Sequence, residues 1–180
     1  QQADALLACD AVVAASADAL QSVSHGRTRL VVNRHVLPMA MQVTHPDKRV
    51  PVDALLTKLK LAAGDEQVEV FDAQMMSRRA LGDTMGANIM MLGYAWQQGL
   101  VPVSAVAIER AIELNGVAID NNHLAFRIGR AAAHDPAALD ALLAASKAPK
   151  ALPEESFPEM LERLAHRLTE YQGSGHADRL

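Results

Sequence analysis

Cysteine is nearly absent from this sequence, in which Cys9 is the only one among 180 residues. A single thiol excludes an internal disulfide, a CxxC redox pair and a complete set of cysteine ligands for an iron–sulfur cluster within this chain. Aromatic residues make up only 3% of the sequence, although half of it is apolar. The core is therefore expected to consist of Ala, Leu, Val, Ile and Met, a composition that suits closely packed helices.

Excess positive charge and long apolar runs are also missing. Lys and Arg number 17 against 21 Asp and Glu, which gives no electrostatic footprint for nucleic acid or an anionic membrane. Asp4, Asp10 and Asp18 interrupt the alanine-rich start, and no run of 18 uncharged apolar residues follows. Neither a signal peptide nor a membrane span is therefore expected, and the cysteine content fits a cytoplasmic location.

Strand and helix patterns alternate in the first half of the sequence. Short apolar or β-branched runs indicate strands, Ser16 can cap a helix that Gly26 stops, and Pro51 can open an amphipathic helix. The expected elements are strand 10–15, helix 16–24, strand 28–35, strand 39–44, helix 51–64 and strand 67–71. This alternation favours a parallel or mixed sheet.

Helical periodicity dominates the second half, with segments near 73–81, 84–98, 103–114 and 120–133. The segment 84–98 is apolar nearly all round and carries small residues, so we expect it to be buried. Asp83 is predicted to be its N-cap. The predicted fold class is α/β, a three-layer α/β/α arrangement with the sheet in the first half and covering helices in the second.

The sequence predicts that the C-terminal part is a separate segment. The predicted organisation is a domain over 1–146, a linker over 147–153, and an amphipathic helix and tail over 154–180. A capping box at 156–159 opens that helix. Its apolar face consists of Phe157, Leu161, Leu164, Leu168 and Tyr171. Because this face is too apolar to stay in water, the helix either folds back on its own domain or docks on a neighbouring chain. We expect the second outcome, a homodimer with the helix at or near the interface.

No residue pattern indicates catalysis in this chain. Gly82-Asp83 and Asn121-Asn122 are similar to the ends of a magnesium-diphosphate motif, but Asp83 lacks the following Gly and the separation is too long. The seven histidines are scattered and form no metal-binding pair on one helix. No serine lies in a nucleophile elbow. We therefore assign no catalytic, cofactor-binding or metal-binding residue.

Several motifs occur in an order typical of one protein family. They are Phe71-Asp72-Ala73, Gly82-x5-Asn88, Met91-Leu92-Gly93-Tyr94-Ala95, Val103-Ser104, Ile108-Glu109-x-Ala111-Ile112-Glu113-Leu114-Asn115 and Asn122-x-x-Ala125-Phe126-x-x-Gly129-Arg130. With upstream matches at 10–13, 17–20 and 31–33, the sequence resembles the gamma domain of 2-oxoacid:ferredoxin oxidoreductases over roughly residues 3 to 135. Segments 92–102, 111–118 and 168–172 look closest to the long, fused bacterial indolepyruvate:ferredoxin oxidoreductases.

The resemblance implies one domain of a larger thiamine diphosphate-dependent enzyme. Such an enzyme oxidatively decarboxylates an aryl 2-oxoacid to an acyl-CoA and reduces ferredoxin. In the family, thiamine diphosphate, magnesium and iron–sulfur clusters sit in other domains, so the isolated chain is expected to be inactive. The family's opening glycine-rich loop is absent, so the first strand and helix of the domain are expected outside this chain. Asp120 stands where the family often has Glu.

The residues shared with the family are expected to be structural. They are Asn33, Asp72, Asn88, Gly93, Asn122, Ala125, Phe126 and Gly129. The polar members lie at predicted element ends or on apolar helices, where such side chains usually satisfy backbone groups. Contact with substrate or coenzyme A across a domain boundary is the alternative role. For the whole chain, the alternative is a stand-alone interaction module without enzymatic activity, which binds a partner through its C-terminal helix.

Overall fold

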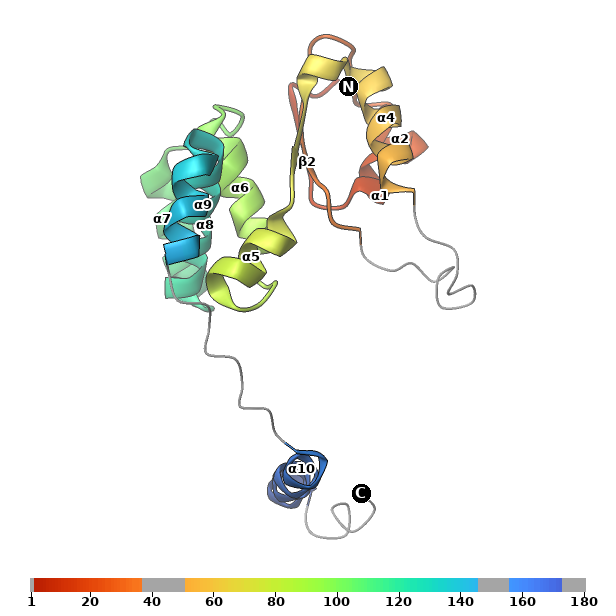
Figure 1. The fold of residues 1–180 in the computed structure, drawn as a ribbon. Coiled ribbons are helices and arrows are strands. Elements are labelled where there is room, and N and C mark those ends of the chain that lie inside the picture. The colour runs from red at the N-terminus through yellow and green to blue at the C-terminus, as the bar shows by residue number, and fades with distance from the viewer. Residues whose placement is uncertain (1, 37–50, 146–155, 173–180) are drawn as a thin grey trace. The chain divides into compact units, whose positions relative to one another are not determined.

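Three short strands form a parallel sheet in the first of the two units into which the chain divides after Ser146 (Figure 1). The computed structural model describes residues 2–36, 51–145 and 156–172. In the sheet, β2 (Arg29–Asn33) lies between β1 (Ala5–Ala8) and β3 (Val68–Phe71). Leu7 pairs with Val31, and Val31 pairs with Glu69 across the two interfaces. The central strand is therefore the one buried on both faces.

Helices that connect the strands cover one face of this sheet. Between β1 and β2 the chain forms α1 (Ala11–Ala14) and α2 (Ala17–Leu20), and α4 (Val52–Ala63) with the single-turn η1 (Asp65–Gln67) precedes β3. The core on this side consists of Ala8, Ala11, Ala14, Ala15, Leu30, Val32, Leu56, Leu59, Ala63 and Val68. The described helices of the two connections, α1 and α4, pack on the same face, as expected when parallel strand–helix–strand units share one handedness.

The later helices of the first unit lie on the opposite face. They are α5 (Ala73–Leu81), α6 (Ala87–Gln97), α7 (Ala105–Asn115), α8 (Ile119–His134) and α9 (Pro136–Ala145). Side chains alternate along a strand, so Val31 points to this side while its neighbours point to the other. Fully buried Val31 joins one cluster with Met90 and Met91 of α6. The predicted three-layer α/β/α fold is thereby confirmed (Figure 1).

Two glycines allow α6 and α8 to cross at very short range. A Cβ atom on Gly93 would meet the carbonyl oxygen of Phe126 well inside 3.0 Å, and one on Gly129 would meet the carbonyl oxygen of Met90. Real Cβ atoms essentially never approach backbone so closely. Each glycine therefore admits the backbone of the other helix, and no larger residue fits at either position without moving the helices apart.

A cluster of polar side chains, Arg29, Glu69 and Tyr94, connects α6 to β2 and β3 of the sheet. Arg29 donates to a carboxylate oxygen of Glu69 at 2.8 Å and to the carbonyl oxygen of Gln98 at 3.2 Å. The Tyr94 hydroxyl donates to the other oxygen of Glu69 at 3.1 Å, and its ring stacks on Phe71 at 4.8 Å between centroids. Burial and the nearby charge of Glu69 raise the pKa of Tyr94. The phenol thus stays protonated and keeps donating.

The prediction of a strand over 10–15 is wrong, because the first strand lies earlier, at Ala5–Ala8. Asp10 is the N-cap of α1, and its Oδ1 accepts hydrogen bonds from Val12 N at 2.7 Å and Val13 N at 3.3 Å. This carboxylate satisfies two first-turn amides and so starts a helix in the apolar run. A short apolar segment does not distinguish strand from helix by its pattern alone.

The remaining strands and helices agree with the sequence in most places. Strand 28–35, helix 51–64, strand 67–71 and the four helices of the second half are confirmed within three residues at each end. Ser16 caps α2 as predicted, but this helix ends at Leu20 instead of near residue 24. The helix α9 was not predicted. The strand expected at 39–44 and the linker at 147–153 lie outside the described residues.

The prediction that Asp83 caps the buried helix is also wrong. The N-cap of α6 is Gly86, and the Asp83 side chain accepts a hydrogen bond from Met85 N at 2.9 Å. Asp83 thus closes a turn upstream of the helix. The sequence pattern was misleading because Asp stabilises turns and helix starts by the same kind of bond, from its carboxylate to an amide two or three residues later.

The second unit contains α10 (Phe157–Gln172). The Glu159 carboxylate accepts hydrogen bonds from both the backbone N–H and the hydroxyl of Ser156, each at 2.7 Å, and these bonds lower the pKa of Glu159. The bond from the Ser156 N–H to the Glu159 carboxylate is one of the two bonds of the predicted capping box, and the Ser156 hydroxyl donates to the same carboxylate instead of accepting from the Glu159 N–H. Phe157 is 67% exposed. No helix among the described residues is long and apolar enough to cross a lipid bilayer.

We predict that Gly93→Leu lowers the free energy of unfolding by about 1 to 3 kcal/mol, because the new side chain meets the backbone of α8. Helix propensity alone would favour Leu over Gly by about 0.8 kcal/mol, so a loss of stability isolates the packing effect. Urea denaturation followed by circular dichroism measures the change.

The matched control is Ala107→Leu on the exposed side of α7, which should change stability by less than about 0.5 kcal/mol. A Gly93→Leu variant as stable as this control would contradict the close crossing of α6 and α8.

Candidate functional site

The carboxyl ends of the three strands place polar residues at one edge of the sheet. Cys9 follows β1, His35 lies two residues beyond β2, and Asp72 follows β3. In open parallel sheets, ligands bind outside the carboxyl ends of the strands. This edge of the sheet is therefore the candidate ligand-binding region.

Asn33 connects all three strand ends from a fully buried position. Its amide nitrogen donates to the carbonyl oxygen of Cys9 at 3.1 Å and to the side-chain oxygen of Gln74. Its amide oxygen accepts from the backbone N–H groups of Ala73 at 3.2 Å and His35 at 3.3 Å. Both donors and the acceptor are thus engaged, three of the four bonds with backbone groups.

These bonds also fix the orientation of Gln74. Because the Gln74 side-chain oxygen accepts from Asn33, its amide nitrogen is turned away from Asn33 and remains available as a donor. The backbone of His35 is held by the same asparagine. One buried residue therefore positions two side chains of the strand-end surface.

Asp72 begins α5 as its N-cap. Its carboxylate accepts a hydrogen bond from Met75 N at 2.8 Å, which satisfies a first-turn amide of this helix. A negative charge here is also favoured by the helix dipole. The carboxylate is thus used by the fold.

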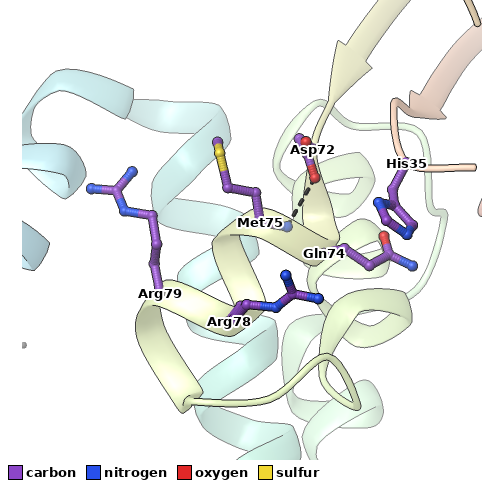
Figure 2. A pocket seen from close by; sticks show the side chains of 6 residues that line it. All are labelled: His35, Asp72, Gln74, Met75, Arg78 and Arg79. Atoms are coloured by element: carbon purple, nitrogen blue, oxygen red, sulfur yellow. Dashed lines mark hydrogen bonds between the residues drawn. The ribbon is translucent and has the colours of Figure 1, made fainter. Parts of the chain in front are cut away.

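A cavity of about 350 Å³ lies at this edge. Its lining consists of His35, Asp72, Gln74, Met75, Arg78 and Arg79. Figure 2 shows His35, Gln74 and Arg78 on the same side of α5, with Arg79 pointing the other way. Arg79 pairs with Asp140 of α9 at 2.7 Å, whereas Arg78 has no ion pair among the described residues. The lining can bind a small polar group through its donors.

Cys9 supplies the one thiol near this edge, directly after β1. It is exposed by surface area, yet its thiol is desolvated enough that burial raises its pKa. The protonated thiol is therefore favoured over the thiolate that metals and clusters need. An iron–sulfur cluster needs about four such ligands, which one cysteine does not supply.

Asp83 and Asn122, where the sequence is similar to the ends of a magnesium-diphosphate motif, both make local hydrogen bonds in the structure. Asp83 is exposed and bonded to Met85 N, and the Asn122 amide donates to the carbonyl oxygen of Val117 at 2.9 Å. Within residues 2–36, 51–145 and 156–172, no group of three or more His, Cys, Asp or Glu side chains could hold a metal ion.

The eight residues that carry the resemblance lie in separate parts of the structure. Asn33 and Asp72 lie at the strand-end edge. The crossing of α6 and α8 contains Gly93, Ala125, Phe126 and Gly129, all of them buried. Asn122 bonds locally at the start of α8, and Asn88 is exposed on α6.

Sequence reasoning missed His35, Gln74 and Arg78 as lining residues. The available signal was the position of Asn33 and Asp72 at strand ends, since the residues just beyond them line the same edge.

We predict that Asn33→Ala lowers the free energy of unfolding by about 1 to 3 kcal/mol, because the buried N–H of Ala73 loses its acceptor. The strand-end contacts of Cys9 and Gln74 are lost at the same time. Chemical denaturation of the purified chain measures the difference.

The control variant is Asn88→Ala, which removes an exposed asparagine from α6 and should leave stability unchanged or slightly higher. Equal stabilities of the two variants would mean that Asn33 does not hold the strand ends together.

Comparisons with models of protein families, with curated proteins and with solved structures find no match to this chain.

Proposed function

We propose that this chain is a gamma-type domain of a thiamine diphosphate-dependent 2-oxoacid:ferredoxin oxidoreductase, of the indolepyruvate type. The whole enzyme would convert an aryl 2-oxoacid and coenzyme A to an acyl-CoA and carbon dioxide, while ferredoxin takes up the two electrons. This chain would supply a scaffold for the catalytic domains in the cytoplasm.

The observation that carries the proposal is the contact between two separate blocks of the resemblance. Block 91–95 contains Gly93 and block 122–130 contains Gly129, and each glycine faces the backbone of the other helix. If the two blocks resembled the family only by chance, they would not need to be in contact. In the structure, Gly93 and Gly129 belong to these blocks, and they are also the residues that allow α6 and α8 to cross closely.

The chain's own residues support a structural role. The polar side chains at the strand ends are engaged with backbone: Asn33 with three strand-end segments and Asp72 with α5. Thiamine diphosphate, when bound elsewhere in the enzyme, would supply the carbanion chemistry of decarboxylation. The sheet and the packed helices would hold that neighbouring machinery in place.

The test uses the native protein that contains this sequence. We expect it to contain thiamine diphosphate and iron, and to reduce ferredoxin or a viologen dye when indolepyruvate and coenzyme A are both present. The purified 180-residue chain should bind neither thiamine diphosphate nor iron in calorimetry and metal analysis. A native protein without either cofactor, or micromolar cofactor binding by the isolated chain, would contradict the proposal.

The second candidate function is a stand-alone interaction module. The observation that favours it is α10, which forms its own unit and exposes 67% of Phe157. In this case the native protein would lack oxidoreductase activity, and a partner would be retained through α10.

We also propose that α10 mediates a homodimer, through Leu161 and Leu164 with Phe157 beside them. Each large apolar side chain contributes about 1.5 to 3 kcal/mol when it is fully buried. Light scattering should give a dimer for the wild type and a monomer for Leu161→Glu with Leu164→Glu. Thr169→Glu, at an exposed position of the same helix, should remain dimeric. A monomeric wild type or a dimeric double variant would refute this assignment.

A further inference from the structure

A second cavity lies away from the strand ends, beside the last turns of α6 and α8. Its volume is about 330 Å³, and its lining consists of Gln97, Arg127, Arg130, Ala131 and His134. No Asp or Glu contributes to that lining. Arg127, Arg130 and His134 lie three and four residues apart on α8, so they share one face of the helix. The cavity is therefore lined on one side by two arginines and a histidine.

Arg130 is held in place by neutral groups. The centre of its guanidinium lies 4.5 Å from the centroid of the Trp96 ring and 5.9 Å from that of Phe126. Its Nε donates to the side-chain oxygen of Gln97 at 3.2 Å. Trp96 is itself fixed, because its indole N–H donates to the carbonyl oxygen of Val103 at 2.6 Å. The guanidinium thus has a fixed plane before any ligand arrives.

The charge of Arg130 is left uncompensated by this arrangement. Among the described residues, Arg130 has no salt bridge, and both terminal nitrogens remain without a carboxylate. Arg127 approaches Glu109 at 3.7 Å, which is near the limit for an ion pair, and its side chain is 63% exposed. Two guanidinium groups can therefore turn donors toward the same cavity.

We propose that this cavity binds an oxyanion, a carboxylate or a phosphate, with Arg130 as the bidentate ligand and Arg127 as a second donor. A planar guanidinium matches two oxygens of either group through parallel hydrogen bonds. Stacking on Trp96 has already ordered the side chain, so little additional rotamer entropy is lost on binding. The site rests on contacts within α6, α8 and the segment at Val103, and it stands independently of the oxidoreductase proposal.

The experiment exploits the fact that Trp96 is the only tryptophan in the sequence. Its fluorescence reports directly on the guanidinium stacked upon it. The purified chain is titrated with inorganic phosphate and, separately, with malonate, each against sodium chloride at the same ionic strength. We expect a saturable change in emission with at least one probe. A response to phosphate alone assigns a phosphate ligand, and a response to malonate alone assigns a carboxylate ligand.

Three variants test whether the change in Trp96 emission arises from anion binding in this cavity. Arg130→Lys keeps the charge but loses the planar fork, and it should weaken binding by about tenfold or more. Arg127→Gln should weaken it by a smaller factor, about threefold. Arg110→Lys on α7, whose guanidinium pairs with Glu113 outside the cavity, should bind like the wild type.

Two results would overturn the proposal. One is a wild-type signal that follows ionic strength identically for both probes and chloride. The other is wild-type affinity in Arg130→Lys, with its fold verified by circular dichroism. If Arg130→Lys does not fold, the test uses Arg127→Gln, because Arg127 is exposed. Wild-type affinity for the anion in this variant then refutes the proposed site.

Discussion

The fold of the first unit depends on one buried amide, the side chain of Asn33. It bonds the backbone carbonyl after β1, the backbone N–H of His35 after β2 and the N–H of Ala73 at the start of α5. Because Asn33 is fully buried, water cannot replace these bonds when they break. The three strand ends are thus held at fixed positions, and with them the His35 and Gln74 side chains that line the nearby cavity.

A second constraint acts through the crossing of α6 and α8. Gly93 and Gly129 let the two backbones approach closely, and this fixes the relative position of the residues that follow on each helix. Trp96 lies one turn after Gly93, and Arg130 directly follows Gly129. The close crossing therefore explains how a tryptophan on one helix supports an arginine on the other. The proposed scaffold role and the proposed anion site depend on the same packing.

Local signals in the sequence predicted most of the elements. The helix over 51–64 has a clear apolar face and a terminal glycine, and α4 confirms it. The prediction of a strand at 10–15 was wrong because the Asp10 carboxylate accepts hydrogen bonds from two first-turn amides and so begins a helix, in an apolar run whose pattern alone does not distinguish the two elements. The positions of Asn33 and Asp72 at strand ends pointed to this edge of the sheet, but the sequence did not show which neighbouring side chains line its cavity. His35 and Arg78 lie far apart along the chain, and only pairing of β2 with β3 brings them to one edge.

Hydrogen exchange at the Ala73 amide tests the role of Asn33 most directly. Ala73 is the first residue of α5, so its N–H has no acceptor within the helix, and Asn33 Oδ1 is its acceptor at 3.2 Å. We predict that this amide exchanges as slowly as the amides of β2 in the purified chain at native conditions, as measured by NMR. Exchange as fast as that of the exposed first-turn amide of Val106 in α7 would contradict the account.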